Sequence, residues 1–105
     1  MISDDRLQKA LTYLAETDGE CAELKAAVER HEYIKKRRRA AVYLSVTGSV
    51  EERKARAEVS SEVEDAEQQY TDVLVQFEQM AAKRKTEALI IDVWRSINAN
   101  RRQGQ

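Results

Sequence analysis

The sequence contains no proline and only three glycines in 105 residues. Proline and glycine are the residues that disfavour helix interiors most strongly, so their scarcity leaves long stretches free to be helical. Alanine, glutamate, lysine, arginine, glutamine and leucine are abundant instead, a composition typical of long helices and coiled coils. A chain of this length has room for one core at most. We therefore expect a single all-α domain over residues 1–105.

Residues that carry chemistry are also scarce. Cys21 is the only cysteine, which excludes an intramolecular disulfide, and its helix-core spacing favours a small buried side chain over a reactive thiol. His31 is the only histidine, and it has no histidine or cysteine partners for a zinc site. Its neighbourhood favours a packed or surface side chain over a catalytic base. No glycine-rich phosphate loop or nucleophile elbow occurs. We predict a protein that is not an enzyme and has no metal site and no cofactor.

Long apolar runs are missing as well. No stretch approaches the roughly 20 apolar residues that a membrane span requires, and the acidic N-terminus around Asp4 and Asp5 does not look like a secretory signal. Charged residues make up 35% of the chain, but the net charge is only −1, which excludes a simple polycation that coats nucleic acid through bulk charge. We expect a cytoplasmic protein with no membrane partner. A basic amphipathic helix on a membrane surface is disfavoured, because helix packing already requires the apolar stripes.

Two stretches show apolar residues at spacings of three, four and seven, which predicts long helices over about 4–46 and about 62–100, followed by a frayed tail at 101–105. Asp18-Gly19 is a soft spot where the first helix can bend. The first stripe comprises Leu7, Leu11, Leu14, Cys21, Leu24, Val28, Ile34, Ala41 and Leu44. The second comprises Val63, Ala66, Tyr70, Val73, Phe77, Met80, Ala88, Ile91 and Trp94.

The segment between the long helices carries stop and start signals. Gly48 can adopt a left-handed conformation, and the spacing of Ser49 and Glu52 forms a capping box for a short linking helix at about 50–58. Ser61 and Glu64 repeat this spacing at the start of the last helix. Similarly, Ser3 can cap the first helix.

Charge alternates in blocks along the chain. Residues 1–29 and 51–70 are acidic, whereas residues 30–40 and 83–105 are basic. Folding the long helices antiparallel places opposite blocks side by side, so we predict a long, antiparallel, coiled-coil-like hairpin with a short linking helix.

The C-terminal part of the last helix has apolar residues on almost every side. A two-helix contact cannot bury them all, which predicts a homo-oligomer. The alternative is that the first helix breaks at Gly19 and its first half covers this surface. Trp94 is expected to be a packing anchor rather than a ligand platform. The predicted oligomer interface consists of Leu89, Ile90, Val93, Trp94 and Ile97.

The run of basic residues from 35 to 39 has two interpretations. One is that it fixes the antiparallel arrangement of the hairpin. The other is that it binds nucleic acid, because five consecutive residues cannot all face one partner helix, and outward cations beside tyrosines suit phosphates and bases. The candidate nucleic-acid-binding residues are Lys35, Lys36, Arg37, Arg38, Arg39, Tyr43, Arg95, Arg101 and Arg102.

Two stretches, GSVEERKA at 48–55 and WRSINANRR at 94–102, resemble segments of small helical proteins of tailed bacteriophages that are encoded among recombination and replication functions. The organisation of the chain is also loosely similar to that of the recombination mediator of T-even phages, which forms rings and binds single-stranded DNA. The resemblance implies an oligomeric accessory protein in the host cytoplasm that binds single-stranded nucleic acid, loads a recombinase, or does both. Its implied protein partner is a recombinase or another DNA-metabolism protein of the phage or host. The alternative is a coiled-coil adaptor or inhibitor that binds only protein.

Overall fold

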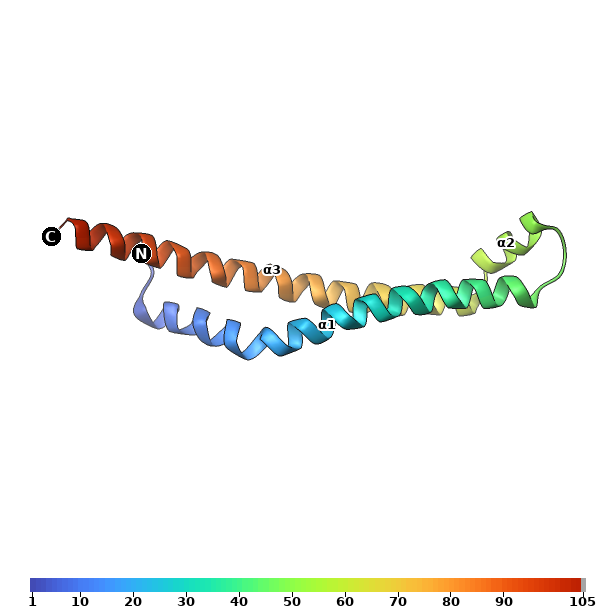
Figure 1. The fold of residues 1–105 in the computed structure, drawn as a ribbon, viewed down its shortest axis with the longest axis horizontal. Helices are drawn as coiled ribbons and strands as arrows, with labels where there is room; N and C mark the ends of the chain where they lie inside the picture. The colour runs from blue at the N-terminus through green and yellow to red at the C-terminus, as the bar shows by residue number, and fades with distance from the viewer. Residues whose placement is uncertain (105) are drawn as a thin grey trace. The chain divides into compact units, whose positions relative to one another are not determined.

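The structure, a computed structural model, describes residues 1–104 and contains three helices, α1 (Asp4–Ser45), α2 (Val50–Glu58) and α3 (Ser61–Gln103) (Figure 1). No strand occurs in these residues, which confirms the predicted all-α class. Helix α1 runs through Asp18 and Gly19 without a break. Helix α3 continues beyond the predicted end near Asn100, so residues 101–103 are helical rather than frayed, while Gln105 lies outside the described residues.

The helices contribute to two compact units. Unit 1 combines Met1–Ala22 with Glu78–Gln105, and unit 2 comprises Glu23–Phe77. In each unit, a stretch of α1 packs antiparallel against a stretch of α3, which confirms the predicted helical hairpin (Figure 1). Helix α2 belongs to unit 2. None of the helices within residues 1–104 is long and apolar enough to cross a membrane.

The turn between α1 and α2 follows its sequence signals. Gly48 has a φ of +122°, in the region that disfavours side chains, so the expected positive φ is confirmed. The hydroxyl of Ser49 accepts a hydrogen bond from the backbone N–H of Glu52 at 3.2 Å, which satisfies one free donor of α2. Ser3 caps α1 in the same way, because its hydroxyl accepts from the N–H of Arg6 at 3.1 Å.

The predicted cap of α3 is wrong by one residue. Ser61 is the first helical residue, and Ser60 is the one that caps. The Ser60 hydroxyl accepts from the N–H of Glu62 at 3.2 Å, and its carbonyl accepts from the N–H of Glu64 at 3.0 Å. Ser60 and Ser61 both carry a hydroxyl that could cap the helix. Ser60 does so because the turn before α3 ends at this residue.

Side chains sheltered from solvent repeat along α3 at alternating spacings of three and four, the pattern of a coiled-coil seam. The positions that follow this repeat are Val63, Ala66, Tyr70, Val73, Phe77, Met80, Arg84, Glu87, Ile91, Trp94 and Asn98, and the half-buried Glu67, Leu74, Ala81, Ile90 and Ile97 flank them. The predicted stripe matches except at Ala88, which is exposed while its neighbour Glu87 is buried. The seam therefore includes charged residues, which a search for apolar periodicity passes over.

The seam of α1 is also displaced from part of the predicted stripe. Leu11, Ala41 and Leu44 are exposed, and the buried positions beside them are Ala10 and Val42. Leu44 keeps 75% of its surface. Ala10 and the buried Thr17 are seven residues apart and follow the repeat of the seam, whereas Leu11 falls one residue outside it.

The buried core of unit 2 is small and involves all three helices. Val42 of α1, Ala57 of α2 and Val63 of α3 form it, and the half-buried ring of Tyr43 packs against it. Ala57 is therefore the one buried residue that α2 contributes to this core, and the surface between α1 and α2 remains open.

Candidate nucleic-acid interface

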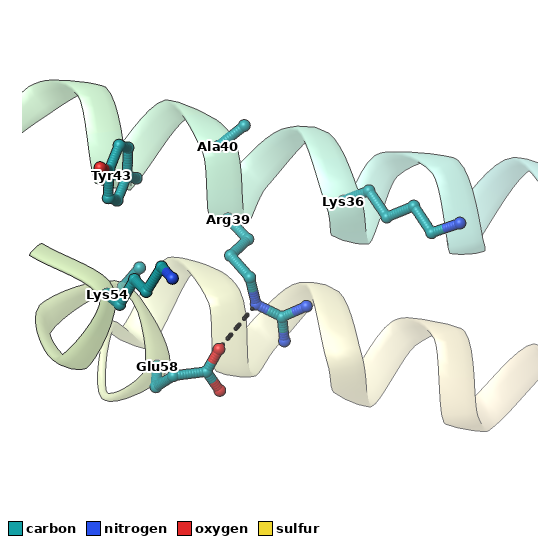
Figure 2. A pocket seen from close by; sticks show the side chains of 7 residues that line it. Lys36, Arg39, Ala40, Tyr43, Lys54 and Glu58 are labelled. Atoms are coloured by element: carbon teal, nitrogen blue, oxygen red, sulfur yellow. Dashed lines mark ion pairs between the residues drawn. The ribbon is translucent and has the colours of Figure 1, made fainter. Parts of the chain in front are cut away.

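The consecutive basic residues 35–39 separate into two groups. Lys35 and Arg39 point toward the other helices of unit 2. The ammonium of Lys35 lies 4.2 Å from the ring centre of Tyr70. Arg39 forms an ion pair with Glu58 of α2 at 3.0 Å (Figure 2). It forms a second ion pair with Glu67 of α3 at 2.7 Å. These two cations hold the helices together, as the structural interpretation of the run predicted.

Lys36, Arg37 and Arg38 are exposed. Lys36 has one ion-pair partner, Glu32, at 3.9 Å, and a pair between exposed side chains at that distance contributes little. Arg37 lies 5.7 Å from the ring centre of the exposed Tyr33. Arg38 forms no ion pair within residues 1–104. These three cations are accessible to an anionic ligand.

An open groove of about 640 Å³ lies between α1 and α2. Its lining combines small apolar side chains with charged ones from both helices. Figure 2 shows Tyr43 of α1 near Lys54 of α2, with Arg39 reaching across to Glu58. The lining residues are Lys36, Arg39, Ala40, Tyr43, Lys54, Ala57 and Glu58.

Charge within the groove is unequally satisfied. Arg39 and Glu58 neutralise each other, whereas Lys54 forms no ion pair in the described part of the chain and Lys36 has only its weak contact. Ala40 contributes an exposed methyl group, and the nearly buried Ala57 lies at the floor of the groove. The groove thus offers an apolar surface accompanied by two cations that have no strong partner in the part of the chain that the structure describes.

Tyr43 is placed differently from the free stacking platform that the sequence predicted. The guanidinium of Arg53 lies 4.1 Å from its ring centre, and Arg53 Nε donates to the Tyr43 carbonyl at 3.2 Å. Because an intramolecular cation already occupies one face of the ring, only the surface that lines the groove is available to a ligand.

The remaining candidates, Arg95, Arg101 and Arg102, belong to unit 1 and are exposed toward the C-terminal end of α3. Arg95 pairs with Asp92 at 3.9 Å, where both side chains are largely exposed. Arg101 and Arg102 lie in the last turn of α3, where cations complement the helix dipole.

A further basic group at 83–85 is mostly engaged within unit 1. Arg84 donates to the Leu14 carbonyl at 2.9 Å and to the Thr17 hydroxyl at 2.6 Å, and it also pairs with Asp18. Lys83 lies 4.5 Å from the ring centre of Tyr13.

The predicted oligomer residues divide by exposure. Leu89, with 61% of its surface exposed, and Val93 face solvent. Ile90, Trp94 and Ile97 are half-buried within unit 1. The structure describes a single chain, so the interface itself stays a prediction.

Sequence reasoning missed Lys54 as a site residue. The capping box of Ser49 and Glu52 predicted the short helix that contains Lys54. The sequence did not show that this helix folds back onto α1, because the core contact of Ala57 with Val42 and Val63 is not encoded in any local pattern.

Within residues 1–104 no group of three or more histidine, cysteine, aspartate or glutamate side chains could hold a metal ion. Comparisons with protein-family models, curated proteins and solved structures found no match for the chain.

Proposed function

We propose that the protein is a non-enzymatic, self-associating helical accessory protein that binds single-stranded nucleic acid through unit 2. The observation that supports this proposal is the groove between α1 and α2, where an apolar surface is accompanied by Lys36 and Lys54, neither of which has a strong partner among residues 1–104. Single-stranded nucleic acid presents a phosphate charge and a flat base at every nucleotide, and it is bound by surfaces that offer cations and apolar or aromatic groups together.

Each part of the groove has a role in this proposal. Lys36 and Lys54 neutralise phosphates and release their counterions. The exposed Ala40 and the free surface of Tyr43 receive a base. Outside the groove, Arg37 and Arg38 extend the cationic surface along α1.

The cellular setting is proposed from the resemblance of residues 48–55 and 94–102 to phage proteins. The first of these stretches includes Lys54, which lines the groove, and the second includes Arg95, Arg101 and Arg102. The accessory role is therefore placed in phage DNA recombination or replication, in the host cytoplasm, with the loading of a recombinase as one form of it.

Fluorescence anisotropy with a labelled single-stranded oligonucleotide tests the proposal. We expect Lys36→Ala combined with Lys54→Ala to weaken binding about tenfold or more at low salt, and to reduce the slope of log affinity against log salt by roughly 1.4, about 0.7 for each lost phosphate contact. The matched control is Lys9→Ala combined with Lys25→Ala, which removes two exposed lysines of α1 away from the groove. Equal affinity for the two double variants would contradict the proposal.

A second candidate function, a protein adaptor or inhibitor, is favoured by one observation. Leu44, Val50 and Val59 are large apolar residues near the ends of α1 and α2, and all are exposed, Val59 to 83%. Nucleic-acid binding does not require these exposed apolar side chains, whereas a protein partner could bury them. In that case Leu44→Ser combined with Val59→Ser abolishes binding of the protein partner. Lys36→Ala combined with Lys54→Ala leaves that binding unchanged.

A further inference from the structure

Helix α3 carries a second stripe of small and apolar residues on the side that faces away from α1 in unit 1. Ala82, Thr86, Leu89 and Val93 are spaced by four, three and four residues, and all are exposed. The seam that packs on α1 uses Arg84, Glu87, Ile91 and Trp94, which fall on the opposite side of the same helix. The second stripe thus has coiled-coil spacing but no partner helix within residues 1–104.

Two opposite charges flank this stripe on the same side. Lys85 and Asp92 are seven residues apart, so they occupy equivalent positions two turns from each other. Together with Ala82, Thr86, Ala88 and Leu89, they line a shallow groove of about 470 Å³. Lys85 forms no ion pair within residues 1–104, and Asp92 has only the 3.9 Å contact with Arg95.

This arrangement of a positive and a negative charge is complementary to the same surface of a second copy whose α3 helix runs in the opposite direction. A two-fold axis perpendicular to antiparallel helices brings Lys85 opposite the partner's Asp92, and Asp92 opposite the partner's Lys85. In a parallel second copy, Lys85 would instead flank the partner's Ile90, and no pair between Lys85 and Asp92 would form. The charge pattern therefore favours the antiparallel orientation of the two α3 helices.

We propose that this face of α3 is a homodimer interface in which the α3 helices of two copies pack antiparallel. In the register that pairs Lys85 with the partner's Asp92, Leu89 lies opposite the partner's Thr86, and Val93 lies opposite the partner's Ala82. Each large residue then meets a smaller one, as interdigitating layers require. Charge and size select the same register independently.

This inference deepens the self-association in the proposed function and rests on it, but it is independent of nucleic-acid binding. Its residues belong to unit 1, whereas the groove that supports nucleic-acid binding belongs to unit 2. The dimer can therefore be measured without nucleic acid, so failure of one proposal is distinguishable from failure of the other.

Sedimentation equilibrium of the full chain over a range of concentrations tests the interface. We expect a dimer for the wild type. Lys85→Asp or Asp92→Lys alone turns two attractive pairs into like-charge pairs, and we expect either change to raise the dimer dissociation constant about tenfold. The combined variant exchanges the charges and restores the dissociation constant to within about threefold of the wild type. Lys9→Asp, an equal charge change at an exposed site of α1, is the matched control and leaves it unchanged.

Leu89→Glu provides a second test, because it places charges at the centre of the proposed contact on a side chain that is exposed in the single chain. We expect a monomer whose helical circular dichroism is retained. If the wild type is a monomer throughout, both the self-association and this interface are wrong. If the wild type is a dimer that Leu89→Glu leaves intact, or that the charge exchange does not restore, then this interface is wrong while self-association holds.

Discussion

The guanidinium of Arg84 donates a hydrogen bond to the hydroxyl of Thr17 at 2.6 Å, from a seam position of α3 to a seam position of α1. Thr17 is buried, with 8% of its surface exposed, and its hydroxyl in turn donates to the Tyr13 carbonyl at 2.7 Å. A polar contact thus occupies a layer of unit 1 that an apolar pair would fill in a simple coiled coil. Because a buried polar group without its partner is costly, this contact specifies which residues of the two helices meet.

Removing the Arg84 side chain should destabilise the protein. Arg84→Ala leaves Thr17 and the Leu14 carbonyl without their donor, and we expect the free energy of unfolding to fall by about 2 kcal/mol. Urea denaturation followed by circular dichroism measures the change. Lys9→Ala removes an exposed cation of the same unit and should alter the free energy of unfolding by less than about 0.5 kcal/mol. A similar effect of the two substitutions would mean that the Arg84 contacts contribute nothing.

Gly19 is the opposite case, a helical position where a side chain should help. A Cβ atom added at Gly19 meets nothing within 4 Å, and the helix is continuous through this residue. Alanine disfavours the unfolded chain and favours the helix relative to glycine, so Gly19→Ala should raise the free energy of unfolding by roughly 0.5–1 kcal/mol. A rise in the thermal midpoint would record it. A fall would indicate that the chain requires the flexibility of glycine at this position.

Replacing Gly48 by alanine should change the free energy of unfolding in the opposite direction. Its φ of +122° is rarely adopted by residues with side chains, and an added Cβ would crowd the Glu52 side chain. We expect Gly48→Ala to lower the free energy of unfolding by about 1 kcal/mol or more, measured in the same denaturation experiment. Unchanged stability would show that the turn between α1 and α2 can adopt another conformation at no cost.

Glu58 provides a way to strengthen the proposed nucleic-acid binding rather than weaken it. Its carboxylate lines the groove and neutralises Arg39, which keeps its second partner Glu67. Glu58→Gln removes the negative charge, so we expect about two- to fivefold tighter binding of single-stranded oligonucleotide at low salt in an anisotropy titration. Glu23→Gln, an exposed carboxylate of α1 away from the groove, is the control. Weaker binding by Glu58→Gln would argue against the groove as the site.

The parts of the fold that depend on local chemistry were predictable. Ser3, Gly48 and Ser49 have the conformations or cap contacts expected of them, because each signal acts within a few residues. The apolar repeat of α3 predicted most of its seam for the same reason. Arg84 and Glu87 could not be placed on the seam from apolar periodicity, since their burial depends on partners in α1.

The candidate site was predictable only in part. Five consecutive cations on a helix must point in several directions, so the division of residues 35–39 into engaged and free members follows from helix geometry. Which members are engaged depends on Glu58, Glu67 and Tyr70, and therefore on tertiary contacts. Tyr43 shows the same dependence, because Arg53 reaches its ring only after α2 has folded back.

The salt dependence of oligonucleotide binding by the wild-type protein tests the central claim most directly. If unit 2 binds the phosphates of single-stranded nucleic acid through Lys36, Lys54, Arg37 and Arg38, the log affinity should fall linearly with log salt. The slope should be about −0.7 for each phosphate contact, or roughly −2 to −3 in all. Absence of binding at about 50 mM salt, or an affinity that does not change with salt, would contradict the nucleic-acid function.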